Sequence, residues 1–363
     1  MKLRFYMKKN KLLTTTIGSF PKPKYIPIRD WFDSARDQSG MNCPKVTSDQ
    51  TNYLLSNKTN DEHLFRKGIS EVIRLQVELG IDIPTDGEMR RENYIHYHCR
   101  HLNGFDFHKL EHRVLRDGAY ETNLPAIRSK ISHSGNFYSA QEFSFNQSVT
   151  DKPVKFTIPG PLTIMDTSAD CFYNDRIKLN YDLAETVNKE ILALVEKGCK
   201  FIQIDEPLFA RQVNDAETFG FEGIERCFHK VPKDVKKIIH ICCGYPDHLD
   251  DENYKKADPK CYIHLSKSLE LLQIDQVSLE DAHCCNDLSL LELFTNKTII
   301  WGALDVSRSR VETKDEVVNR ISKVLEHIDR ERLVISPDCG LGLLDTSIAM
   351  KKLKIMCESV SII

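Results

Sequence analysis

The segment KKIIHICCGYP, residues 236–246, carries an imidazole and two thiols at the end of a short apolar run. His240 and Cys242 lie two positions apart, so both side chains point to the same face of a β-strand. An imidazole and a thiolate are typical zinc ligands, and soft thiolates favour zinc over magnesium or calcium. A buried histidine beside a buried cysteine is also common in protein cores. We interpret the adjacent Cys243 as a structural thiol or as one that supports the ligands.

Two more potential ligands end other apolar runs. Glu280 closes one run and Cys339 follows another. Together with His240 and Cys242 they give one imidazole, two thiolates and one carboxylate, a set that suits a tetrahedral zinc site. Alternative ligands lie just after Glu280: His283, Cys284 and Cys285.

Further polar side chains also follow apolar runs. They are Ser19, the segment 86–88, Asp205, Asp305 and Asp338. Carboxylates from different strands would then meet on one rim. An acidic residue after a strand can instead cap the next helix, and for Asp338 this alternative carries equal weight.

Short, β-branched apolar runs must position these side chains. Near-continuous apolar runs are typical of parallel strands covered on both faces. The predicted strands are 12–17, 81–86, 154–158, 201–205, 237–242, 274–280, 298–303 and 332–336.

Helical patterns separate the strands. Apolar residues recur at helical spacing in 313–328, 181–198 and 64–79. Thr313 and Glu316 have the spacing of a capping box. The pattern predicts an α/β fold, a single (β/α)8 TIM barrel over residues 1–363, whose active site lies at the carboxyl ends of the strands. A doubly wound open sheet is the alternative, but no G-x-G-x-x-G follows a strand.

Two regions interrupt this rhythm. Residues 22–60 are polar and irregular, and residues 92–150 are rich in His, Asn, Ser and aromatic side chains with weak periodicity. We interpret them as long insertions after strands 1 and 2, at the top of the barrel, with a lid-like position.

Composition excludes several classes of function. The 363 residues include 41% hydrophobic side chains and carry a net charge of -3. The chain has no basic stripe for nucleic acid, no apolar run long enough for a membrane and no apolar segment after its basic start. Twelve cysteines without an export signal favour reduced thiols and a cytoplasmic location. We therefore expect small-molecule partners, and a homo-oligomer remains an option.

Several motifs together resemble one family, the catalytic half of cobalamin-independent methionine synthase. They occur in the same order as in that family and span nearly the whole chain. The motifs are TTTIGSFPKP (14–23), DGEMRRENYIHY (86–97), IPGPLTI (158–164), IQIDEP (202–207), HIC (240–242), SLE (278–280) and SPDCGLG (336–342).

The resemblance implies a barrel that binds Zn²⁺ and homocysteine. Its zinc ligands would be the same quartet. The homocysteine carboxylate would be bound at Ile17 and Ser19, and its ammonium at Glu88 and Asp205. A Zn²⁺-bound thiol loses its proton, so a zinc-dependent transfer of a methyl group to homocysteine, forming methionine, is expected.

The chain departs from the family on the side of the methyl donor. Thr167 stands near the place of a tryptophan that stacks on folate, and Arg211 stands where the family has a glutamate. The family's D-I-H-S proton donor reads Asp305-Val306-Ser307, so Asp305 is the remaining candidate catalytic residue. These differences leave the donor open between methyl-folate, methylcobalamin and small donors.

Other functions compatible with the same residues are alkyl transfer to a different thiol, or thioether cleavage, on the same zinc site. A decarboxylase of the uroporphyrinogen type would need an arginine cluster, and few arginines accompany the N-terminal motif. A non-catalytic zinc-binding barrel is the remaining alternative.

Overall fold

A computed structural model describes residues 11–36, 44–56, 59–115, 120–244, 246, 248–254, 256–258 and 260–363. The basic start of the chain, residues 1–10, and parts of the region 22–60 therefore lie outside the described residues. None of the helices in the described ranges is long and apolar enough to cross a membrane.

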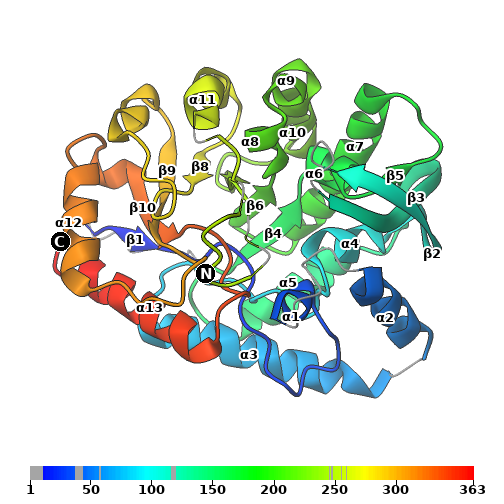
Figure 1. The fold of residues 1–363 in the computed structure, drawn as a ribbon, viewed down its shortest axis with the longest axis horizontal. Helices are drawn as coiled ribbons and strands as arrows, with labels where there is room; N and C mark the ends of the chain where they lie inside the picture. Colours follow the sequence, from blue (N-terminus) through cyan, green and yellow to red (C-terminus); the bar gives the residue numbers. More distant parts are fainter. Residues whose placement is uncertain are drawn as a thin grey trace.

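A parallel sheet forms the centre of the molecule, and helices surround it (Figure 1). Its strands follow the order β1-β10-β9-β8-β7-β6-β4. Their bounds are β1 (Leu13–Thr14), β4 (Lys155–Pro159), β6 (Phe201–Asp205), β7 (Lys236–Ile241), β8 (Gln276–Leu279), β9 (Thr298–Leu304) and β10 (Leu333–Pro337). Six of the eight predicted strands are confirmed within a few residues, and β1 is shorter than the predicted 12–17.

The predicted strand at 81–86 is wrong as a regular strand, although its segment occupies the expected place. Only a single bridge, Thr15 to Ile83, is formed there. Ile83 N donates to Thr14 O at 3.0 Å, and Lys155 N donates to Pro84 O at 2.9 Å. Pro84 has no N–H, so a regular ladder cannot form. The segment nevertheless joins β1 to β4 and curls the sheet into a TIM-type barrel.

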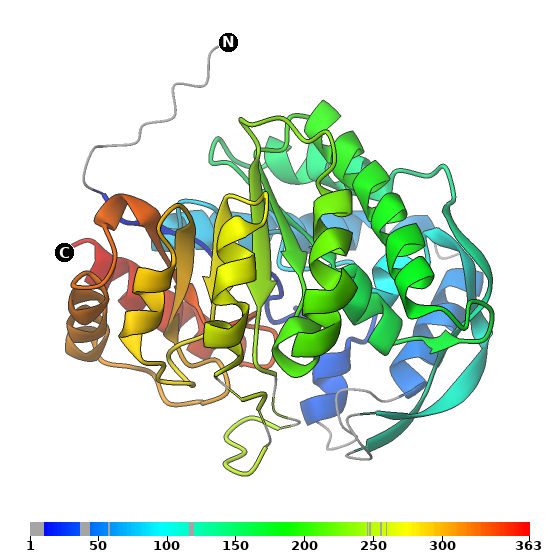
Figure 2. The ribbon, with the colours of Figure 1, turned by 90° about the horizontal axis from the view of Figure 1, so that it is seen from above.

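The outer helices cover the sheet (Figure 2). All three predicted helices are confirmed, as α3 (Glu62–Leu79), α7 (Arg176–Glu196) and α12 (Lys314–Val324). Thr313 and Glu316 form the predicted capping box. The helix α12 ends before the predicted residue 328 because Glu326 N and His327 N bond three residues back and tighten the last turn.

Shorter elements complete the outer layer. Those that follow β4 and β6 are α6 (Pro161–Asp166), α8 (Leu208–Arg211), α9 (Val213–Asp215), the π-helix η2 (Ala216–Gly220) and α10 (Phe221–Cys227). Those that follow β7 to β10 are α11 (Cys261–Leu271), the 3-10 helices η3 (Leu288–Leu293) and η4 (Arg330–Arg332), and α13 (Thr346–Val360).

The two interrupting regions contain regular structure. Region 22–60 holds α1 (Trp31–Arg36) and α2 (Pro44–Leu55), and it is followed by the 3-10 turn η1 (Thr59–Asp61). Region 92–150 holds α4 (Tyr94–Cys99), the strands β2 (Leu102–Leu115) and β3 (Tyr120–His133), and α5 (Tyr138–Ser148).

Region 92–150, whose periodicity in the sequence is weak, therefore contains a small sheet that the sequence pattern did not predict. The strands β2 and β3 pair antiparallel, and β5 (Ala169–Asp170) adds a third strand beside β3. The register between β2 and β3 shifts twice, which breaks the simple alternation that identifies a strand in sequence. Figure 1 shows this small sheet at one side of the barrel.

The barrel interior changes character along its axis. Ile17, Ile238, Ile300 and Val334 form a small buried apolar cluster inside it. His240 lies two residues beyond Ile238 on the same face of β7, and it pairs in register with Asp205 and Ser278. The interior therefore becomes polar toward the carboxyl ends of the strands.

Candidate metal and substrate site

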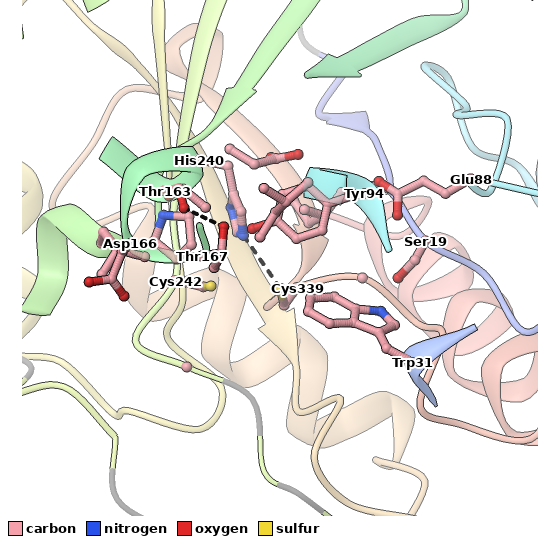
Figure 3. Close-up of a pocket in the computed structure, with 18 of the residues that line it drawn as sticks. Ser19, Trp31, Glu88, Tyr94, Thr163, Asp166, Thr167, His240, Cys242 and Cys339 are labelled. Atoms are coloured by element: carbon pink, nitrogen blue, oxygen red, sulfur yellow. Dashed lines mark hydrogen bonds between the residues drawn. The ribbon is translucent and has the colours of Figure 1, made fainter. Parts of the chain in front are cut away.

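Three of the predicted metal ligands meet at the carboxyl ends of β7 and β10. The ligand atoms of His240, Cys242 and Cys339 lie within 4.8 Å of one another, and all three residues are buried. Cys339 Sγ lies 3.5 Å from His240 Nε2, as Figure 3 shows. Residues 99 positions apart in the chain thus present a compact set of one imidazole and two thiols.

The orientation of the imidazole is fixed from the neighbouring strand. Ser278 Oγ on β8 lies 2.9 Å from His240 Nδ1. This contact turns Nε2 toward the two thiols. Metal-ligating histidines commonly have such a partner on the second ring nitrogen, because it holds the ring in one orientation.

The electrostatics of the trio favour a thiolate. The hydrogen bond from Cys339 lowers the pKa of Cys242 well below its usual value, and the neighbouring imidazole lowers it further. Burial opposes a charge on His240, but the hydrogen bond to Cys242 and the negative charges of Cys242, Asp205 and Glu280 together raise the pKa of the imidazole. A deprotonated sulfur is the form that binds a metal cation.

Glu280, the fourth predicted ligand, faces a neighbouring set of side chains. Its Oε2 accepts from Lys256 Nζ at 2.9 Å and from Cys243 N at 3.1 Å. Cys284 Sγ donates to the same oxygen at 3.6 Å. The ligand atoms of Cys243, Glu280 and Cys284 lie within 4.8 Å of one another, as a second cluster.

The four residues predicted to bind the amino acid line one cavity together with three of the predicted metal ligands. Ile17, Ser19, Glu88 and Asp205 all belong to its wall. The segment after β10 holds Ser19 in place, since Leu341 N donates to Ser19 O at 2.8 Å. In Figure 3, Ser19 and Glu88 lie on the same side of His240.

The Glu88 carboxylate is held by a rare backbone conformation. Its φ of 58° lies in the left-handed region, which non-glycine residues seldom adopt. Thr157 Oγ1 donates to Glu88 Oε1 at 3.2 Å, and Arg91 Nη1 lies 3.4 Å from the same oxygen. Burial raises the pKa of Glu88 to about 7, against the opposing effect of Arg91.

The pKa of Asp205 is also set by opposing effects. Burial raises its pKa to about 6, while His240 and the hydrogen bond from Gln203 act in the opposite direction. Gln203 Nε2 donates to Asp205 Oδ1 at 2.7 Å and to Ile17 O at 2.9 Å. Two buried carboxyl groups that titrate near neutrality are well suited to a cationic ligand, whose charge would favour their ionised forms.

Sequence reasoning missed the aromatic wall of this cavity. Trp31 and Phe32 from α1 line it, together with Tyr94 from α4. Trp31 is one of only two tryptophans in the chain. That rarity was the one available signal, but the irregular pattern around Trp31 gave no reason to place it near the barrel ends.

The two positions where the chain departs from the resembling family also lie on this wall. Thr167 donates from Oγ1 to Thr163 O at 2.7 Å. Arg211 donates from Nη2 to Cys243 O at 3.1 Å. In Figure 3, Thr167 and Asp166 lie on the opposite side of the predicted metal ligands from Trp31.

Asp305 lies in a second, smaller cavity that also includes Lys256, Glu280 and His283. Ser307 Oγ donates to Asp305 Oδ1 at 2.6 Å, and His283 Nδ1 lies 3.3 Å from Oδ2. Burial raises the pKa of Asp305, but these two hydrogen bonds, the one from Ser307 N and the charge of His283 together hold the pKa well below its usual range. His283 is a neighbour of Asp305 that sequence spacing could not reveal.

Asp338 caps a turn and not a helix. It accepts backbone hydrogen bonds from Asp281 N at 2.9 Å, Ala282 N at 2.9 Å and His283 N at 2.8 Å. These residues directly follow Glu280, and Asp338 directly precedes Cys339. Asp338 therefore fixes the end of β10 against the end of β8.

Comparisons with known proteins find relatives along almost the whole chain. Residues 12–224 and 254–361 match the family described as the cobalamin-independent synthase catalytic domain. A methionine synthase of Saccharolobus islandicus (strain Y.G.57.14) is 32% identical over 356 residues, covering 97% of this chain and 95% of that protein. The methionine synthase of Sulfolobus acidocaldarius is also 32% identical, over 355 residues, with 97% and 92% covered.

A solved structure has the same fold. The B12-independent methionine synthase from Shewanella sp. W3-18-1, in complex with selenomethionine, superposes with a TM-score of 0.81 and 26% sequence identity, covering 97% of each chain.

Proposed function

We propose that this chain, which belongs to the cobalamin-independent synthase catalytic-domain family, transfers a methyl group to the sulfur of homocysteine and so forms methionine. The name methionine synthase of its relatives supports this activity. The observation that carries the proposal is the single cavity that joins His240, Cys242 and Cys339 to the four residues predicted to bind the amino acid.

The residues present fit a zinc ion. Two thiols and an imidazole with close ligand atoms are a donor set that Zn²⁺ accepts, with room for a further ligand. Bound there, Zn²⁺ would lower the pKa of a thiol substrate so that its sulfur is a strong nucleophile at neutral pH. Glu280 would complete the set after leaving Lys256, and it is retained as the proposed fourth ligand.

The amino-acid end of homocysteine would lie against the residues from the ends of β1, of the 81–86 segment and of β6. Glu88 and Asp205 would bind the ammonium group, and Ser19 with the backbone near Ile17 would bind the carboxylate. These contacts fix the distance between sulfur and methyl donor, which is the positioning contribution to catalysis. Asp305 is proposed to act only indirectly, by orienting His283.

The state of the cysteines bears on where the protein works. The cysteines among the described residues are all free, which supports a reducing compartment such as the cytoplasm. We propose a single catalytic unit over the whole chain.

The test is a donor screen with purified, zinc-analysed protein. Homocysteine is combined separately with methyl-folate, methylcobalamin and small methylated donors, and methionine is measured. We expect methionine from at least one donor, and none when cysteine replaces homocysteine. If the protein binds zinc tightly but forms no methionine from any class of donor, the proposed function is contradicted.

A further inference from the structure

The outer part of the cavity has an aromatic corner. The rings of Trp31 and Tyr94 lie 5.5 Å apart, with their planes inclined at 59°. Phe32 meets Trp31 edge-on at 5.4 Å and supports it from the buried side. A planar heterocycle stacks best between parallel faces, whereas inclined faces form a concave corner. The shape therefore favours a rounded group over a flat one.

The charges around the cavity favour a cation. Its described wall contains the carboxylates of Glu88, Asp166 and Asp205, whereas Arg211 is its one guanidinium group. If Glu88 and Asp205 bind the ammonium of homocysteine, Asp166 remains in the cavity wall, on the opposite side from Trp31 (Figure 3). Its Oδ1 accepts from Gln212 Nε2 at 2.7 Å. A methylated sulfonium or quaternary ammonium centre is attracted both by ring faces and by a carboxylate. Arg211 is placed to bind a carboxylate on the same molecule.

Such a donor also needs no acid in the cavity wall to protonate its leaving group. The homocysteine thiol loses its proton to solvent, its sulfur attacks the methyl carbon, and the carbon–onium bond breaks. The bonding pair stays with the leaving group, which departs as a neutral thioether or tertiary amine. That leaving group needs no proton. His240 is the one imidazole in the described wall, and it is already engaged by Ser278 and Cys339.

We propose that the corner formed by Trp31 and Tyr94 binds a small zwitterionic methyl-onium donor, with Asp166 and Arg211 on the facing wall. This inference rests on the proposed function and specifies its second substrate. It also gives the first interrupting region a role, since α1 supplies Trp31 to the cavity.

Binding is measured first, by calorimetry on the zinc-loaded protein. The probes are S-methylmethionine and glycine betaine, and the control ligand is 3,3-dimethylbutanoate, which has the shape of glycine betaine without its positive charge. We expect at least one onium probe to bind about 10-fold or more tightly than 3,3-dimethylbutanoate. Equal binding of the onium probes and 3,3-dimethylbutanoate would overturn the inference.

The aromatic contribution is tested with Trp31→Leu and Trp31→Phe. We expect Trp31→Leu to weaken onium binding about 10-fold, Trp31→Phe to weaken it less, and the KM for homocysteine to stay unchanged in both. The matched control is Phe172→Leu, which removes an exposed ring outside the cavity wall. An unchanged onium affinity in Trp31→Leu would overturn the inference.

Methyl transfer separates this inference from the proposed function. Methionine formed from an onium donor supports both. Methionine formed only from methyl-folate or methylcobalamin would overturn the onium inference and leave the proposed function intact. No methionine from any donor would contradict the proposed function, while the binding data would still decide whether the corner accepts an onium group.

Discussion

At the scale of single residues, the proposed chemistry depends on two sulfurs that approach one imidazole from separate strands. Cys339 is the more distant in sequence, and its Sγ lies 3.5 Å from His240 Nε2. We predict that Cys339→Ser weakens zinc binding by about 100-fold or more and abolishes turnover, because a hydroxyl is a poor substitute for a thiolate ligand.

Metal analysis after dialysis against a competing chelator measures this effect. Cys171→Ser is the matched control, since Cys171 is a free and exposed cysteine outside the cavity. A Cys339→Ser protein with one equivalent of zinc and the wild-type rate would refute the ligand assignment.

The buried carboxyl groups predict a pH dependence of substrate binding. Burial raises the pKa of Glu88 to about 7 and that of Asp205 to about 6. Both groups must be ionised to bind an ammonium group, so binding is weak when they are protonated and strengthens as pH rises through these values. We predict that the KM for homocysteine falls between about pH 5 and about pH 8 and then levels off.

Initial rates across this range provide the measurement. Glu88→Gln should give a high KM at every pH, with only the dependence due to Asp205 remaining. The control Glu78→Gln, at an exposed position of α3, should keep the wild-type profile. A KM independent of pH in the wild-type protein would argue against carboxylate recognition of the substrate.

The residue types at the strand ends were enough to predict which residues form the site, but they did not predict every contact within it. His240, Cys242 and Cys339 could be predicted because each stands at the end of an apolar run. The pairing of Glu280 with Lys256 could not, because Lys256 lies in a polar segment without periodicity. The same holds for His283 and Asp305, which meet only through the fold.

At the scale of elements, Asp338 connects β10 to the turn after β8. We predict that Asp338→Ala lowers the free energy of unfolding by about 3 kcal/mol or more, because three backbone N–H groups lose their acceptor at about 1–3 kcal/mol each. Asp338→Asn keeps an acceptor oxygen, so its loss should be smaller.

Urea unfolding of the three proteins measures the order of stability. The matched control is Asp258→Ala. The Asp258 carboxylate accepts an exposed hydrogen bond from Lys260 N, so its removal should lower the free energy of unfolding by less than about 1 kcal/mol. Equal stability of Asp338→Ala and the wild type would show that the turn does not depend on this carboxylate.

Elements with strong periodicity were the most predictable from the sequence. The capping box at Thr313 located the start of α12 to the residue. The strand at 81–86 was mistaken because β-branched residues suggest a ladder that Pro84 prevents. The strands β2 and β3 were missed because their register shifts remove the alternation on which recognition depends.

At the scale of the whole molecule, the proposed zinc ion would link β7 to β10 across the barrel. A ligand that binds only the folded state stabilises it, by about 4 kcal/mol at a concentration 1,000 times its dissociation constant. We predict that removal of zinc lowers the midpoint of thermal unfolding by several degrees and that added zinc restores it.

Calorimetry of the protein with and without chelator tests this prediction. The Cys339→Ser variant serves as the control, because its unfolding should not respond to zinc. Identical unfolding of the wild-type protein with and without zinc would argue against a bridging ion.

The barrel could be predicted from the sequence because apolar runs and helical patterns alternate along the chain outside residues 22–60 and 92–150. The aromatic corner was not, because Trp31 and Tyr94 come from two regions that interrupt this repeat. Their proximity depends on how those regions fold onto the barrel, which no local pattern encodes.

X-ray absorption spectroscopy at the zinc edge tests the central claim most directly, since it counts the sulfur atoms near the metal at about 2.3 Å. The account predicts two sulfur neighbours in the zinc-loaded protein and three after homocysteine is added. A count below two without homocysteine, or no increase when saturating homocysteine is added, would contradict it.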